Sequence, residues 1–267
     1  MSDEPKERAF VAFDWSGAEK AYEEAIWMAL VQQGRLQRLE NGFQRARVAD
    51  ELIQVEKEHG RLTVGFDFAF SFPEWFVRRQ GAASGPEFWT IAEQRLEVWI
   101  GGETLQPPFH LGRWGDGTCA EFARFPNKRA TDPAEADSCF HLQGPKQVGR
   151  GALRGFAVLR KLEQSGFKIW PFDPPSVSSS LVIEIYPRRL YEEPRVSKGK
   201  WRERVRYLKE HHPKQDPAML ERAAGSDHAF DAAVSALRMA GCASELDSLR
   251  EGEPHEKIEG RIWRPAG

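Results

Sequence analysis

Four acidic residues interrupt segments that are otherwise apolar enough to form buried strands or helices. They are Asp14 in AFVAFDWSG, Asp67 in LTVGFDFAFSF, Glu184 in SLVIEIYP and Asp231 in SDHAFDAAVSAL. Burial of a lone carboxylate is unfavourable unless a cation or a hydrogen-bond donor compensates it. A divalent cation is the simplest explanation that covers all four, and hard carboxylate oxygens suit Mg²⁺ or Mn²⁺.

Strand periodicity places three of these acids. Side chains alternate along a strand, so in residues 63–72 the phenylalanines share one face while Asp67 lies on the other with small residues such as Gly65. Asp14 comes at the carboxyl end of its apolar run, and Glu184 comes just before a proline that closes another. Any one of them could be a turn residue bonded to backbone donors. All four together favour a shared cation.

The helical segment adds a narrow polar stripe. From residue 227 to residue 239 nearly every position is apolar, and the exceptions recur at helical spacing: Asp227, Asp231, Ser235 and Arg238. Asp227 also suits the N-cap position of this helix, whereas Asp231 lies one turn further in. Both acids are candidate ligands, and the spacing does not choose between them.

The order of the expected elements predicts an α/β fold in one domain, residues 1–267. Strands are expected at 9–15, 25–31 and 35–40, then a helix at 44–59, a strand through Asp67, a strand through Glu184, a helix at 227–241 and an edge strand at 258–263. Residues 73–172 are dense in Gly, Pro and charge over much of their length and fit this scheme poorly. We therefore expect them to be an insertion after the fourth strand.

This order of elements and acids resembles the RNase H-like fold. In sequence order, FVAFDWSG, VGFDFAFSFP, VIEIYPRRLY and SDHAFDAAVSALRMA with EGRIWRP resemble motifs of an uncharacterised RNase H-like family called domain of unknown function 429. FHLQGPKQVGRGALRGFAVLRKLEQSGFKIWPFD is similar to a block found in one branch of that family. The resemblance implies a mixed five-stranded sheet, three antiparallel strands and then parallel ones, flanked by helices, with the acids converging at one edge. The helix motif is also similar to that of Holliday-junction resolvases, in which acids on the last helix complete a metal site.

Together these features predict a metal-dependent nuclease that hydrolyses phosphodiester bonds by a two-metal mechanism. Asp14 is expected to bridge two ions, with Asp67 and Asp231 as flanking ligands. Glu184 or Asp227 would be a further ligand or would orient the attacking water. Nucleic acid is the expected partner.

Two basic segments are candidates for phosphate contact. PKQVGRGALRGF has the composition of a glycine-rich turn that leads into a helix N-terminus, where Lys146, Arg150 and Arg154 would reinforce binding of a phosphate. A glycine-flanked core helix is the alternative interpretation. Residues 198–214 carry seven Lys or Arg and two Glu, with aromatic residues between them, which suits a sugar-phosphate chain or a solvated helix face.

Composition limits the setting. The formal net charge of −2 provides no global field for nucleic acid, so any contact must use local patches. Three widely spaced cysteines lack metal-ligand spacing and favour a reducing compartment. No apolar run reaches the length of a membrane span, and we expect a cytoplasmic protein that does not enter the membrane.

Other classes of function remain open. The sequence Asp14-Trp15-Ser16-Gly17 is compatible in outline with the phosphate-binding hairpin of actin-like phosphotransferases, which bind ATP but need two copies of the fold. A catalytically inactive RNase H-like module that binds nucleic acid is a further alternative, although retention of four acids disfavours it. A serine or cysteine hydrolase is disfavoured because no nucleophile elbow is present, and His228 is interpreted as a surface residue.

Overall fold

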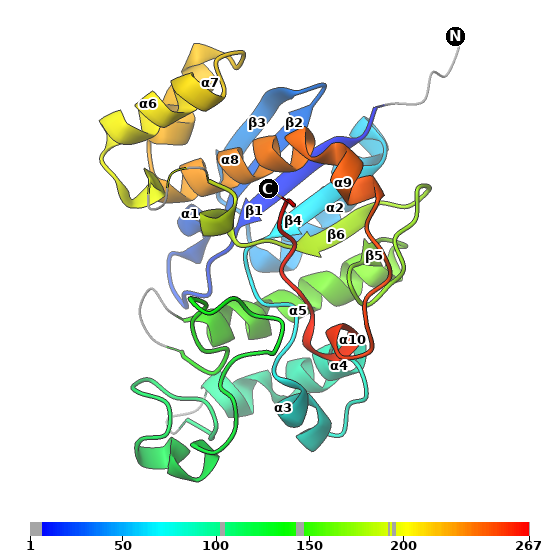
Figure 1. Cartoon of the computed structure of the whole chain (residues 1–267), viewed down its shortest axis with the longest axis vertical. Helices are drawn as coiled ribbons and strands as arrows, with labels where there is room; N and C mark the ends of the chain where they lie inside the picture. The colour runs from blue at the N-terminus through cyan, green and yellow to red at the C-terminus, as the bar shows by residue number, and fades with distance from the viewer. Residues whose placement is uncertain (1–6, 102–104, 143–146, 192, 194–195, 267) are drawn as a thin grey trace.

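The computed structural model describes residues 7–101, 105–142, 147–191, 193 and 196–266 (Figure 1). The strands are β1 (Ala9–Asp14), β2 (Trp27–Gln32), β3 (Arg35–Asn41), β4 (Leu62–Phe66), β5 (Lys168–Ile169) and β6 (Leu181–Glu184). The α-helices are α1 (Tyr22–Ala25), α2 (Arg45–His59), α3 (Glu74–Arg79), α4 (Gly85–Leu96), α5 (Val148–Gln164), α6 (Trp201–His211), α7 (Pro217–Ala224), α8 (Asp227–Gly241), α9 (Ala243–Asp247) and α10 (Glu256–Glu259).

The strands form one mixed sheet in the order β3-β2-β1-β4-β6-β5. The β1, β2 and β3 strands are antiparallel neighbours, whereas β4, β6 and β5 run parallel to β1. The expected α/β class, with antiparallel strands followed by parallel ones, is confirmed. The sheet has six strands rather than five, because β5 comes from the end of the region expected to be an insertion and pairs with β6.

The central strand β1 explains how both faces of the sheet are covered. All six of its residues are buried, as expected for a strand with packed layers on both sides. Val11 and Phe13 belong to the apolar cluster that contains α2 and α5, while Phe10 and Ala12 belong to the cluster that contains α8. Alternation along β1 therefore divides one apolar run between two cores.

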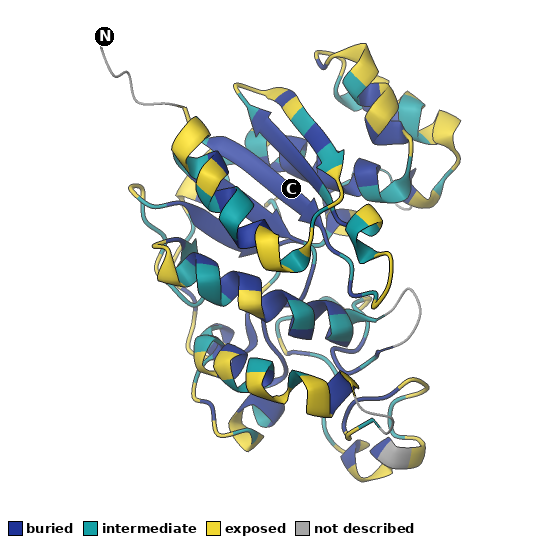
Figure 2. Cartoon of the chain, turned by 180° about the vertical axis from the view of Figure 1, so that it is seen from behind, coloured by how far each residue is buried: buried dark blue, intermediate teal, exposed yellow. Residues whose placement is uncertain are grey.

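Helices α2 and α5 lie on one side of the sheet, and α8 crosses the other side, with α6 and α7 beyond it (Figures 1 and 2). Helix α8 is buried along most of its length, which explains its apolar sequence. Among the helices of the described residues, none is both long enough and apolar enough to cross a membrane.

Several boundaries differ from the expected ones. The β4 strand ends at Phe66, one residue before Asp67, and its last register partner in β1 is Phe13. Asp67 therefore follows the strand and donates its backbone N–H to the carbonyl of Phe13 at 3.2 Å. The expected edge strand at 258–263 is instead the end of α10 followed by a single bridge from Ile262 to Glu184.

The glycines of α5 allow close packing of the helix and do not form a phosphate-binding turn. Gly149 and Gly151 lie inside the helix, and their N–H groups donate to the carbonyls of His141 and Gln147. A Cβ atom at Gly155 would lie 2.4 Å from the ring of Phe68. The expectation of a glycine-rich phosphate-binding turn is therefore wrong, and the core-helix interpretation is confirmed.

We predict that Gly155→Ala destabilises the protein by about 1–3 kcal/mol, because the added methyl group must displace a buried aromatic ring. Gly241→Ala is the matched control, since it also lies in a helix but has no atom within 4 Å of the added Cβ, and it should leave stability unchanged or raise it slightly. Urea unfolding at pH 7 measures both. Equal midpoints for the two variants would contradict the packing role.

Candidate functional site

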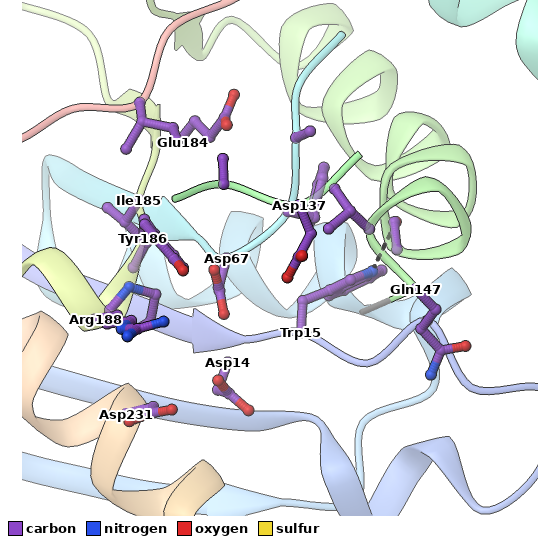
Figure 3. Close-up of a pocket in the computed structure, with 18 of the residues that line it drawn as sticks. Asp14, Trp15, Asp67, Asp137, Gln147, Glu184, Ile185, Tyr186, Arg188 and Asp231 are labelled. Carbon is purple, nitrogen blue, oxygen red and sulfur yellow. Dashed lines mark hydrogen bonds between the residues drawn. The ribbon is translucent and has the colours of Figure 1, made fainter. Parts of the chain in front are cut away.

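Four of the predicted acids line one pocket at the carboxyl ends of β1, β4 and β6. Asp14, Asp67, Glu184 and Asp231 all line this cavity of about 570 Å³ (Figure 3). Phe13 and Phe66 are register partners in the parallel strands β1 and β4. The residues that follow them, Asp14 and Asp67, therefore lie side by side at the carboxyl ends of these strands. Parallel pairing thus brings together two acids that are 53 positions apart in the sequence.

Helix α8 supplies Asp231. Ser226 is its N-cap and accepts a hydrogen bond from the Ala229 N–H at 3.0 Å, which fixes the start of the helix. Asp231 then faces the sheet from the second turn and is only 8% exposed. Its Oδ1 atom is buried without a hydrogen-bond partner in the described part of the chain. Such an oxygen requires an explanation, and a ligand in the pocket would provide one.

Burial dominates the electrostatics of Asp14, Asp67 and Asp231. Desolvation raises the pKa of Asp14, and it raises the pKa values of Asp67 and Asp231 well above the usual range. The charge of Asp14 raises the pKa of each of the other two further. The pocket therefore holds protons at pH values where exposed carboxyls are ionised, and a bound cation would displace those protons.

His228 is a pocket residue that sequence reasoning missed. Its Nδ1 atom lies 2.6 Å from Oδ2 of Asp14, and this hydrogen bond is the main cause that raises the pKa of His228. The side chain is partly exposed, as interpreted from the sequence, but it also lines the pocket. Its spacing of three from Asp231, which puts both on one face of α8, was the available signal.

Glu184 is paired with an arginine and is not open to a cation. Arg129 binds both of its carboxylate oxygens, with Nη1 2.7 Å from Oε2, and the Phe70 N–H donates to Oε2 at 2.9 Å. Both side chains are buried. Glu184 lines the pocket as expected, but Arg129 already compensates its charge, and the pair accounts for its burial without a cation.

Asp227, unlike Asp231, does not line the pocket. Its Oδ2 atom accepts a hydrogen bond from Nζ of Lys198 at 2.6 Å. Burial alone would raise the pKa of Asp227, but the hydrogen bond and the charge of Lys198 lower it below its usual value. Of the two helix acids that the sequence left open, Asp231 is the one in the pocket, and the assignment of Asp227 as a site residue is wrong.

Of the three cations expected to bind phosphate, Lys146 lies outside the described residues. The other two bind residues of the loop after β1. Arg154 donates to the carbonyls of Gly17 at 2.8 Å and Ala18 at 2.7 Å, and so fixes the loop after β1. Arg150 pairs with Glu19 at 3.7 Å. Neither arginine lines the pocket, so their assignment to substrate binding is wrong.

Besides Arg129, which is paired with Glu184, two cations line the pocket, and both come from the segment after β6. Arg188 lies in the short 3-10 helix Pro187–Arg189, and Lys198 ends the 3-10 helix Val196–Lys198. Arg188 and Lys198 are exposed, whereas Asp14 and Asp231 are buried and Asp67 is half-buried. The pocket thus has an acidic floor and a basic rim.

A group of possible metal ligands also lies outside the pocket. Within the described ranges, only Glu193, Glu210 and His211 offer ligand atoms that all lie within 4.8 Å of one another. Both glutamates of that group pair with Arg206. The pocket acids do not meet this spacing.

Comparison of the chain with family models, with curated proteins and with solved structures finds no match. The resemblance to RNase H-like proteins therefore depends on the motifs and on their arrangement in space.

We predict that Glu184→Gln destabilises the protein by about 3 kcal/mol, because it leaves the charge of buried Arg129 only partly compensated by Asp132. Glu135→Gln, which breaks a surface pair with Arg189, should change stability little. Chemical denaturation at pH 7 in the presence of a chelator compares them. A Glu184→Gln variant as stable as the parent would show that Glu184 is not structural.

We predict that Asp67→Asn stabilises the metal-free protein at pH 8. The folded pKa of Asp67 is raised, so on increasing pH the unfolded state loses this proton first, from about pH 4, and stability then falls. Asparagine does not titrate, so it removes this loss of stability. The stabilisation by Asp67→Asn should therefore shrink as the pH falls towards 4. Melting temperatures in chelator across this range test the sign.

Asp50→Asn is the control for this pH profile. Lys161 lowers the pKa of the exposed Asp50 carboxyl, so its substitution should slightly reduce stability at pH 8 instead of raising it. If Asp67→Asn behaved like Asp50→Asn, the electrostatic description of the pocket would be wrong.

Proposed function

We propose that this protein is an RNase H-like, metal-dependent phosphodiesterase that hydrolyses phosphodiester bonds of nucleic acid. The observation that carries this proposal is the convergence of three carboxylates with raised pKa values, Asp14, Asp67 and Asp231, in one pocket. Retaining mutually repelling buried acids costs stability, and binding of divalent cations offsets that cost. Mg²⁺ or Mn²⁺ suits the all-oxygen ligand set.

The arrangement of elements supports the RNase H-like assignment. Three antiparallel strands are followed by parallel β4 and β6, and the last long helix, α8, crosses the sheet beside β1. Acids at the ends of the first and fourth strands and on that helix are what the motif resemblance implied. Membership of the family called domain of unknown function 429 is part of the same proposal.

Each pocket residue has a role that follows from its position. His228 holds Oδ2 of Asp14 and so fixes the orientation of this carboxyl. Asp14, Asp67 and Asp231 would hold the ions, and the unpartnered Oδ1 of Asp231 would gain a ligand. Such ions would activate a water and stabilise the leaving oxygen. The His228 hydrogen bond orients Asp14 before any ion binds.

The single sheet, together with the fixed loop after β1, favours hydrolysis over the actin-like alternative. Arg45 and Arg154 together bind the carbonyls of residues 16–18, which makes this loop a fixed support for Asp14. Burial and the neighbouring Arg154 lower the pKa of Arg45 to about 10. The described residues contain a single sheet of this kind, whereas actin-like enzymes enclose ATP between two copies of the fold.

We predict that Mn²⁺ raises the melting temperature of the parent protein and supports cleavage of a nucleic acid. At a concentration of 100 times the dissociation constant, one ion stabilises the native state by about 2.7 kcal/mol. Asp14→Asn should abolish both the shift and the turnover, because Asp14 is the ligand shared by both ions. Differential scanning calorimetry and a gel-based cleavage assay measure the two effects.

Asp227→Asn is the matched control, since Asp227 lies at the start of the same helix but outside the pocket. It should keep the Mn²⁺ shift and the activity. Full metal-dependent cleavage by Asp14→Asn would rule out the assignment. A parent protein without any Mn²⁺ shift would favour an inactive binding module.

A further inference from the structure

One wall of the pocket comes from residues 129–139 and 147–151, which lie outside the strands of the sheet. Asp137 and Gln147 lie on this wall, on the opposite side of Asp14 and Asp67 from Asp231 (Figure 3). The other walls are the strand ends, helix α8 and the segment after β6. The acids are therefore at the bottom of a walled pocket and not on an open sheet edge.

Buried hydrogen bonds fix this wall to the sheet. Arg129 joins the wall to Glu184 of β6, and it also donates to the carbonyl of Glu259 at 3.0 Å. The Glu259 carboxylate in turn accepts from the N–H groups of Ala130 at 2.6 Å and Glu74 at 2.8 Å. Opening the wall would leave buried charges without partners, so it is a permanent part of the pocket.

The basic rim of the pocket has one arginine with a suitable position for a phosphate. Arg188 lines the pocket and contacts the Tyr186 hydroxyl, whereas the next residue, Arg189, pairs with Glu135 outside it. A guanidinium group binds phosphate oxygens through two parallel hydrogen bonds. Tyr191 adds a buried hydroxyl that has no hydrogen-bond partner within the described ranges.

We propose that the pocket takes one unpaired nucleotide with its phosphodiester, and that Arg188 positions that phosphate over Asp14, Asp67 and Asp231. The cavity of about 570 Å³ is in the size range of small-ligand sites, and enzymes with such pockets act on single strands or on nucleotides taken out of a duplex. The half-buried rings of Tyr186 and Tyr191 line the space for the nucleotide. This inference rests on the proposed function.

The first experiment compares three substrates in Mn²⁺: a single-stranded oligonucleotide, the same sequence as a duplex closed by hairpins at both ends, and a free dinucleotide. We expect the closed duplex to be cleaved at least tenfold more slowly than the other two. Faster cleavage of either the single strand or the dinucleotide shows which of the two supplies the unpaired nucleotide. Equal cleavage of the closed duplex and the single strand would overturn the proposal while leaving the proposed function intact.

Binding in Ca²⁺ gives a readout that does not depend on turnover. The single strand or the dinucleotide should bind at least tenfold more tightly than the closed duplex, as measured by fluorescence anisotropy. Selective binding with no cleavage in Mn²⁺ would support this pocket assignment and contradict the proposed nuclease. Absence of binding by all three would overturn the pocket assignment.

The second experiment tests Arg188 as a positioning residue. Arg188→Gln should raise KM and the Kd in Ca²⁺ about tenfold with little change in kcat, because it weakens a contact made equally before and during the reaction. Arg188→Lys should restore part of the affinity, since it keeps the charge but loses the planar fork. Arg189→Gln is the matched control and should change neither constant. Equal effects of Arg188→Gln and Arg189→Gln would overturn the role of Arg188.

Discussion

Mutual repulsion among buried carboxylates is the constraint on which the rest of this structure depends. Asp14 and Asp231 are almost fully buried, and Asp67 lies close enough that the charges of the three acids influence one another. An apolar core cannot hold three ionised carboxyls without compensation. Raised pKa values relieve the repulsion through bound protons, and a divalent cation would relieve it at neutral pH. The pairing of β1 with β4, the N-cap of α8 and the hydrogen bond from His228 all serve to hold these acids in place.

Glu184 shows how environment alone gives a similar acid a different role. It ends a buried parallel strand, as Asp14 does, and the sequence around it is equally apolar. Arg129 reaches it from the wall of the pocket and binds both oxygens, so its charge is compensated within the protein. That ion pair fixes the wall, and the wall gives the pocket its shape. One carboxylate therefore shapes the site whose chemistry the other three would perform.

Local periodicity was sufficient for the framework. The apolar patterns predicted strands β1 to β4 and helix α8, whereas the mixed sheet and the meeting of Asp14 with Asp67 were implied by the resemblance to RNase H-like proteins. Features that depend on distant partners were not accessible. Nothing near Glu184 indicates that Arg129, 55 residues earlier in an irregular segment, would bind it.

The central claim is that Asp14, Asp67 and Asp231 hold divalent ions while Glu184 remains on Arg129. Crystals soaked in Mn²⁺ and measured at the manganese absorption edge test this claim most directly. We expect anomalous peaks within coordination distance of Asp14, Asp67 and Asp231, with the Arg129 to Glu184 pair unchanged. Peaks only at the surface group of Glu193, Glu210 and His211, or no peak in the pocket, would contradict the account.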